Sequence, residues 1–182
     1  MDFYQKTIKF VDDSFQGKQK AHFERAVYWM LKFFPDSTEA HKIAAYSHDI
    51  ERAFRDKNKL AQEDYLDSKF LRSHMEGGAV IMVDFLGKEK APQGVIDTVM
   101  HLIGAHEIGG DTEQNALMDA DSVSFFETNA EMFVTKKAPV EGYESIKRKL
   151  DWMFERISND EHRSFARPNY EKWIRELEVY KE

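Results

Sequence analysis

The sequence contains no cysteine, which limits the chemistry available to it. Disulfide bonds and thiolate metal ligands are excluded, so a metal site would have to use His, Asp, Glu or backbone oxygen as ligands. A chain that does without disulfides is also typical of a reducing compartment. We therefore expect a cytoplasmic protein.

Long apolar runs and basic blocks are missing as well. The N-terminal stretch MDFYQKTIKFVDDSF is polar and acidic, and no run approaches the roughly 20 apolar residues of a membrane span. The net charge is −7, with no long basic segment. We therefore expect neither a membrane nor a nucleic acid polymer as a partner, whereas the oligomeric state is left open.

What the sequence does contain is typical of one globular domain. The 182 residues are 42% hydrophobic, 32% charged and 13% aromatic. A chain of this length can bury a sizeable core without covalent staples, and no repeat or linker divides it. We expect a single domain over residues 1–182.

Glycine and proline are scarce, with 9 and 4 residues, and they fall between amphipathic segments. This pattern predicts an all-α helical bundle. The expected helices cover about 3–15, 19–34, a segment from PDSTEA onward, 63–72, 74–87, 91–106, 113–130, 141–157 and 168–180. The aromatic residues at 125–126 and 132–134 are also compatible with a strand, but helix is preferred because no alternating segment exists to pair with them.

The stretch AAYSHDIERA, residues 44–53, places His48 and Asp49 directly after small and apolar residues. His48 follows Ala44 by one helical turn and therefore lies on the apolar stripe. A single buried histidine is usually a hydrogen-bonded core residue. The interpretation depends on whether other ligand-type residues also face the core.

Further histidines and an aspartate do lie on apolar helical faces. His22 shares a face with aromatic and aliphatic residues, His74 continues a stripe through Gly78, and Asp121 lies in line with Leu117. Asp119 points roughly the opposite way. His106 continues the apolar stripe of its segment.

His101 is the second choice at that position, because it is turned about 140° from His106. Core-facing ligand groups on five successive helices predict a shared metal centre, since isolated buried charges are costly. Mixed nitrogen and oxygen ligation favours a divalent transition metal (Mn, Fe, Co, Ni or Zn), as one or two ions.

This pattern resembles the HD-domain superfamily of metal-dependent phosphohydrolases. His22, the adjacent pair His48-Asp49, and Asp121 match the family motif in order, over roughly residues 18–130, with residues 131–182 as added C-terminal helices. The resemblance implies that these four residues bind one metal.

Binuclear members of the superfamily carry two further histidines. His74 in HMEGGA and His106 in AHE are similar to these, and Asp49 would then bridge two metals. Since His101 and His106 compete for one position, the number of metals stays open.

The resemblance also implies the activity, namely hydrolysis of a phosphate ester such as a nucleotide or small phosphometabolite by metal-activated water. Asp49 would be essential for catalysis, and Arg25 and Arg52 would anchor the phosphate. Arg55 lies a further turn along. The alternative for these arginines is a solvated face paired with acidic neighbours, namely Glu24, Glu51 or Asp56.

Other residues near the motif are weaker candidates for a functional role. Glu51 and Glu107 are general-base candidates next to ligands. His41 is expected at the surface, and His162 lies beyond the matched region. Two other functions remain open, a di-iron HD-type oxygenase and a non-catalytic signalling or scaffold domain that keeps its metal for stability.

Overall fold

The chain folds into helices joined by short connections. The computed structural model describes residues 2–55 and 67–181, and these contain no strand, which confirms the expected all-α fold. The helices are α1 (Phe3–Phe15), α2 (Lys20–Phe33), α3 (Glu39–Ser47), α4 (Glu51–Phe54), α5 (Ser68–Lys88), α6 (Gln93–Ile103), α7 (Thr112–Thr128), α8 (Ala130–Met132), α9 (Ala138–Glu141), α10 (Tyr143–Glu155) and α11 (Asp160–Leu177), with a π-helical turn η2 (Phe133–Lys137) and a 3₁₀ turn η3 (Glu178–Tyr180).

Side-chain caps explain where several helices begin. The Asp2 side chain accepts a hydrogen bond from the backbone of Gln5 at the start of α1. Asp111 and Gln114 form a reciprocal capping box at the start of α7. These contacts satisfy backbone N–H groups that have no partner within the helix.

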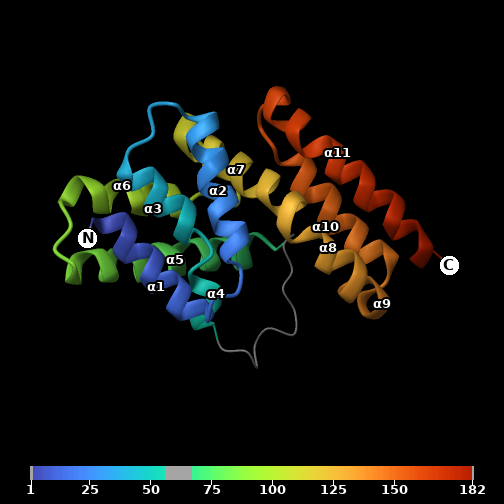
Figure 1. Cartoon of the computed structure of the whole chain (residues 1–182), viewed down its shortest axis with the longest axis horizontal. Coiled ribbons are helices and arrows are strands. Elements are labelled where there is room, and N and C mark those ends of the chain that lie inside the picture. Colours follow the sequence, from blue (N-terminus) through green and yellow to red (C-terminus); the bar gives the residue numbers. More distant parts are fainter. Residues whose placement is uncertain (1, 56–66, 182) are drawn as a thin grey trace.

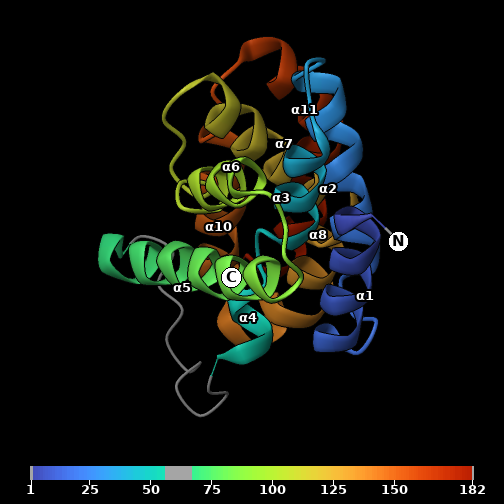
Figure 2. The ribbon, with the colours of Figure 1, turned by 90° about the vertical axis from the view of Figure 1, so that its left-hand side faces the viewer.

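Helices α2 and α7 pack along each other in the middle of the molecule. Figure 1 shows α1, α3, α5 and α6 on one side of this pair and α10 and α11 on the other. Seen from the side in Figure 2, α5 runs beneath α6, against which it packs. The α2–α7 pair therefore joins the N-terminal helices to the C-terminal ones.

One hydrophobic core runs through both sides of the fold. Phe23, Ile43 and Leu117 are buried on the N-terminal side, and Phe126 and Leu150 on the C-terminal side. Removal of this apolar surface from water stabilises the bundle. None of the described helices has the length and apolar character needed to cross a membrane.

Three helix boundaries differ from the sequence predictions. The helices expected at about 63–72 and 74–87 form one continuous helix, α5, from Ser68, and residues 63–66 lie outside the described part. The helix expected from Pro168 begins at Asp160, because the Asn159 side chain caps it, and Pro168 lies inside α11. Helix α6 ends at Ile103, so His106 lies in the turn that follows rather than on the helix.

Candidate metal centre

The first candidate cluster consists of His22, His48 and Asp121, which are 3%, 0% and 6% exposed. His22 lies in the first turn of α2, His48 ends α3, and Asp121 lies in the middle of α7. The Nε2 atoms of His22 and His48 lie 3.2 and 3.3 Å from Asp121 Oδ1. One carboxylate oxygen therefore faces both imidazoles.

Each histidine of this cluster is held at its other ring nitrogen. His48 Nδ1 lies 2.9 Å from the carbonyl oxygen of Ala45, one turn back in α3. His22 Nδ1 lies 3.0 Å from Ser124 Oγ on α7. Contacts of this kind fix the ring orientation of metal-binding histidines and leave Nε2 for the ligand.

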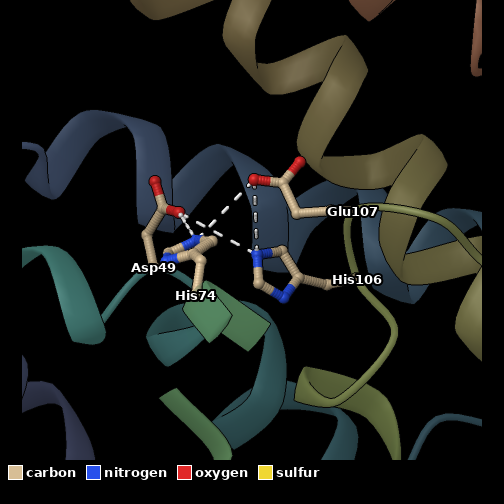
Figure 3. A group of neighbouring side chains, drawn as sticks. All are labelled: Asp49, His74, His106 and Glu107. Atoms are coloured by element: carbon tan, nitrogen blue, oxygen red, sulfur yellow. Dashed lines mark hydrogen bonds and ion pairs between the residues drawn. The ribbon is translucent and has the colours of Figure 1, made fainter. Parts of the chain in front are cut away.

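The second candidate cluster consists of Asp49, His74, His106 and Glu107 (Figure 3). His74 Nε2 lies 3.1 Å from Asp49 Oδ1 and 3.7 Å from Glu107 Oε1. His106 Nε2 lies 3.9 Å from each of the same two oxygens. The two imidazoles and the two carboxylates thus face a common space.

The imidazoles of the second cluster are also held at Nδ1. His74 Nδ1 lies 2.8 Å from Glu51 Oε2, and His106 Nδ1 lies 2.8 Å from the carbonyl oxygen of Ile103. The second cluster adjoins the first, since the ring centroids of His48 and His106 are 5.3 Å apart.

Buried imidazole nitrogens support the fit of a cation. Nε2 of His48 and Nε2 of His106 have no hydrogen-bond partner among the described residues. A buried polar atom without a partner is costly, and a divalent cation in each cluster would satisfy these two nitrogens. In each cluster the potential ligand atoms lie within 4.8 Å of one another, and the mixture of imidazole and carboxylate matches the donors of transition-metal sites.

The electrostatics of the clusters favour the metal-binding form of some ligand groups and not of others. The charge of Asp121 outweighs burial and raises the pKa of His48 to about 9, and hydrogen bonds to Asp49 and Glu51 outweigh burial and raise the pKa of His74. At neutral pH a metal would therefore displace a proton from His48.

Burial lowers the pKa of His106 to about 4, so its ring is neutral at neutral pH. Burial alone would raise the pKa of Asp49, but the charge of Arg52 and the hydrogen bond from His74 hold it well below its usual value. The charge of Arg156 likewise outweighs burial and keeps the pKa of Asp121 well below its usual value.

Arg156 is a site residue that the sequence did not indicate. It follows α10 and forms ion pairs with both Glu107 and Asp121, and its side chain is only 7% exposed. Lys149, Met153 and Arg156 recur at helical spacing, which places them on one face, but this spacing is equally typical of an ordinary core-facing stripe.

A cavity of about 160 Å³ opens beside the two clusters. Ligand-type residues from both clusters line it, together with the cationic side chains Arg52, Lys137 and Lys149. Other lining residues provide an apolar wall: Phe125, Met132, Phe133 and Met153. The cavity therefore combines carboxylates, the imidazole of His22, positive charge and apolar surface.

The arginines predicted to anchor a phosphate have different positions. Arg52 lines the cavity, and its Nε donates to Asp49 Oδ1 at 2.8 Å. Arg25 is not among the lining residues, and its Nε and Nη2 donate to Glu127 on α7 at 2.6 and 2.9 Å. Arg55 forms an ion pair with Glu51, and its Nη2 atom lies 3.2 Å from His74 Nδ1.

The structure distinguishes between His106 and His101 as members of the second cluster. His106 is fully buried in the second cluster, whereas His101 is outside both clusters and lies 2.6 Å from Asp111 Oδ2 on the exposed face of α6. Helix periodicity had placed His106 correctly toward the core, although it lies in a turn.

One expectation about another polar residue was wrong. His41, expected at the surface, is 4% exposed, because it caps α3 with Thr38 and stacks on Phe34. Asp119 points away from the clusters, as helical periodicity predicts, and it is fully buried, where it accepts hydrogen bonds from Ser158. His162 Nδ1 lies 2.7 Å from the same carboxylate, so these residues join α7 to the start of α11.

Comparison with known proteins identifies the family but no characterised relative. No curated protein and no solved structure matches the chain. A family model described as a domain of unknown function (DUF4202) matches residues 5–178, and the chain therefore belongs to this family.

Proposed function

We propose that this protein is a metal-dependent phosphohydrolase that acts on a small phosphate ester. The observation that carries the proposal is the position of two adjacent imidazole and carboxylate clusters beside a cavity that Arg52, Lys137 and Lys149 line. Metal ligands and cationic side chains at one cavity are the two components that phosphoryl transfer needs.

The residues divide into two ligand sets. His22, His48 and Asp121 would hold one metal, and a second would be held by the neighbouring set, Asp49, His74, His106 and Glu107. When bound, such metals supply an activated water and polarise the phosphoryl oxygens. The similarity to the HD-domain motif supports a metal centre at this place, because the matched residues lie in these two adjacent sets, although the motif implies that Asp49 also binds the metal of the first set.

Arg52 is suited to bind the phosphoryl group. Its Nε orients Asp49, while its Nη2 lies 3.5 Å from Glu107 Oε1. The guanidinium therefore lies at the boundary between the second cluster and the cavity. From there it can donate charge-assisted hydrogen bonds to an oxyanion.

Lys149 adds a second positive charge at the cavity. Burial lowers its pKa to about 8, so the ammonium group still carries charge at neutral pH. It lies over the ring of Trp152, with Nζ 4.4 Å from the ring centroid. This position favours an anionic substrate, and the apolar wall favours one with an apolar or planar portion, as in a nucleotide.

Neither Glu51 nor Glu107 is a good general base. The pKa of Glu107 lies at about 2 because the charge of Arg156 outweighs its burial. The pKa of Glu51 also lies at about 2, because hydrogen bonds from His74 and Arg55 outweigh burial. Such carboxylates accept a proton poorly at neutral pH. Glu107 is better suited to bind a metal, and Glu51 to hold His74 in place.

The proposal is tested by metal analysis of the natively purified protein, followed by a screen of nucleotides and other small phosphate esters with the bound metal. We expect metal in the protein and release of inorganic phosphate, with Asp49→Asn as the inactive control. Bound metal without turnover of any ester would overturn the hydrolase proposal. Oxygen consumption by an iron-loaded protein would then indicate an oxygenase, and a purely stabilising metal would indicate a scaffold.

A further inference from the structure

Arg156 lies between the carboxylates of the two candidate ligand sets. Its Nη2 contacts Asp121 Oδ2, and its Nη1 contacts Glu107 Oε2. The other oxygen of each carboxylate faces imidazoles, since Asp121 Oδ1 is directed at His22 and His48, and Glu107 Oε1 at the second cluster. Each carboxylate thus has one oxygen that faces a histidine cluster and another that contacts the Arg156 guanidinium.

The guanidinium itself is held on its other sides. Nε donates to Ser122 Oγ at 2.7 Å, and the guanidinium carbon lies 4.5 Å from the centroid of the Trp152 ring. Ser122 is buried on α7, next to Asp121. The position of Arg156 is therefore fixed by the same helix that carries one of the ligands.

We propose that Arg156 is a positioning residue that limits Asp121 and Glu107 to one ligand oxygen each and couples metal binding at the two sites. This inference rests on the proposed metal centre, and it assigns a role in that centre to α10. The helix lies outside residues 18–130, which carry the similarity to HD-domain proteins, so the role does not follow from that similarity.

The chemistry of the side chain explains why an arginine is needed. An ionised carboxylate can bind a metal through both oxygens, and occupation of one oxygen by a charged donor favours binding through the other. A guanidinium has donors on several edges in a rigid plane and can hold two carboxylates together with Ser122. A lysine at the same place has one nitrogen, which cannot reproduce this arrangement.

Arg156 also balances negative charge at the two sites. Asp49, Glu107 and Asp121 bring three carboxylates into a small buried region. Arg52 and Arg156 provide the permanent positive charges in contact with them. Loss of Arg156 would leave Asp121 and Glu107 to repel each other across the two sites.

The test is cobalt binding to wild type and to Arg156→Met and Arg156→Lys. Calorimetry gives the number of bound ions and their affinities, and the visible absorption of Co²⁺ gives the coordination geometry. We expect Arg156→Lys, which keeps the charge but loses the fixed geometry, to bind Co²⁺ about tenfold to a hundredfold more weakly than wild type, as is usual for loss of a residue that orients ligands. Arg156→Met also removes a positive charge beside two carboxylates, which by itself favours a cation, so it should bind Co²⁺ more tightly than Arg156→Lys. The visible spectrum should change at both sites, although only one residue was replaced.

Arg163→Met is the matched control. Arg163 also lies at the junction of α10 and α11, but it contacts Asp160 and the carbonyl oxygen of Ile157 rather than a ligand. The control should lower stability without changing the Co²⁺ spectrum. If Arg156→Met does not fold, Arg156→Lys retains the charge and most of the packing and decides the question.

Wild-type affinities and an unchanged spectrum in the folded Arg156 variants would overturn the inference. A changed spectrum at only one site would overturn the coupling. Failure of the proposed function is distinguishable, because it would be seen as wild-type protein that binds Co²⁺ yet hydrolyses no phosphate ester. Wild-type protein that binds no divalent metal would overturn both.

Discussion

Each imidazole of the two clusters is oriented by a contact at Nδ1, and this determines how a replacement should act. The partners are backbone carbonyl oxygens for His48 and His106, a serine hydroxyl for His22 and a carboxylate for His74. Loss of one ring therefore removes a ligand and leaves its partner group buried without it. The effects on metal content and on stability should appear together.

We predict that His48→Ala and Asp49→Ala lower both the metal content and the melting temperature. Each change removes a ligand and leaves the remaining buried groups without a cation. His101→Ala is the control, since His101 is exposed and lies outside both clusters. Elemental analysis and thermal unfolding measure the outcome, and full metal content in both ligand variants would contradict the assignment.

The two arginines expected to bind phosphate should now behave differently. Arg52→Ala should lower kcat/KM by about tenfold to a hundredfold, because a charge-assisted hydrogen bond of roughly 1.5–3 kcal/mol is lost. Arg25→Ala should have a smaller effect on kcat/KM, since Arg25 binds Glu127 rather than the cavity. Steady-state kinetics on an ester from the screen measure both, and equal losses would mean that Arg25 also reaches the substrate.

At the scale of single residues, the sequence predicted the candidate ligands better than the residues that hold them in place. Helical periodicity placed His22, His48 and His106 toward the core, where the structure has them. Arg156 was missed because its partners lie far away in sequence, and nothing in helical spacing distinguishes a buried ion pair from a solvated charge. His41 was misjudged for a related reason, since burial near a helix start depends on the packing of other helices.

At the scale of elements, α5 approaches the turn after α3 closely at Gly78. A Cβ atom at this position would lie 3.2 Å from Ile103 Cγ2 and 3.4 Å from the carbonyl oxygen of His48. Ile103 is fully buried and His48 is a candidate ligand, so neither can move freely. The glycine allows His74, one turn earlier in α5, to reach the second cluster.

We predict that Gly78→Ala lowers the melting temperature and weakens metal binding, despite the higher helix propensity of alanine. Gly87→Ala in the same helix is the matched control, because a Cβ there meets nothing within 4 Å. The control should gain about 0.5–1 kcal/mol from helix propensity. Thermal unfolding and cobalt titration of the two variants give the comparison, and a Gly78→Ala protein as stable as the control would refute the close-approach argument.

Helix boundaries show what local sequence signals can and cannot predict. The start of α1 and the segments of α2 and α7 agree with the predicted ranges, because apolar periodicity is strong there. The start of α11 was predicted at about residue 168, too late, because the helix begins at Asp160 and Pro168 lies inside it. The cap at Asn159 is the real start, and its acceptance of hydrogen bonds from the backbone of Glu161 and His162 is seen only in the structure.

At the scale of the whole molecule, the all-α class followed from the sequence, whereas the role of the C-terminal helices did not. The family match extends over residues 5–178, so α10 and α11 belong to the family domain. Arg156, Lys149 and Met153 bring α10 to the clusters and the cavity. Sequence gave no sign of this, because the packing of α10 onto α7 is a tertiary contact between distant segments.

A metal centre that joins the central α2–α7 pair to the N-terminal helices should be linked to the stability of the whole chain. The ligands come from α2, α3, α5 and α7 and from the turns after α3 and α6, and such a site is absent from an unfolded chain. A metal at a free concentration of 100 times its Kd should therefore stabilise the protein by about 2.7 kcal/mol. For a domain of this size, that corresponds to roughly 5–11 °C in melting temperature.

We predict that removal of metal by a chelator lowers the melting temperature by this amount, and that added Mn²⁺ or Co²⁺ restores it with a dependence on the logarithm of metal concentration. His48→Ala provides the control, because it lacks a ligand and should respond less to both treatments. Differential scanning calorimetry at several metal concentrations measures the slope. A melting temperature that does not depend on metal would contradict a centre built from all of these helices.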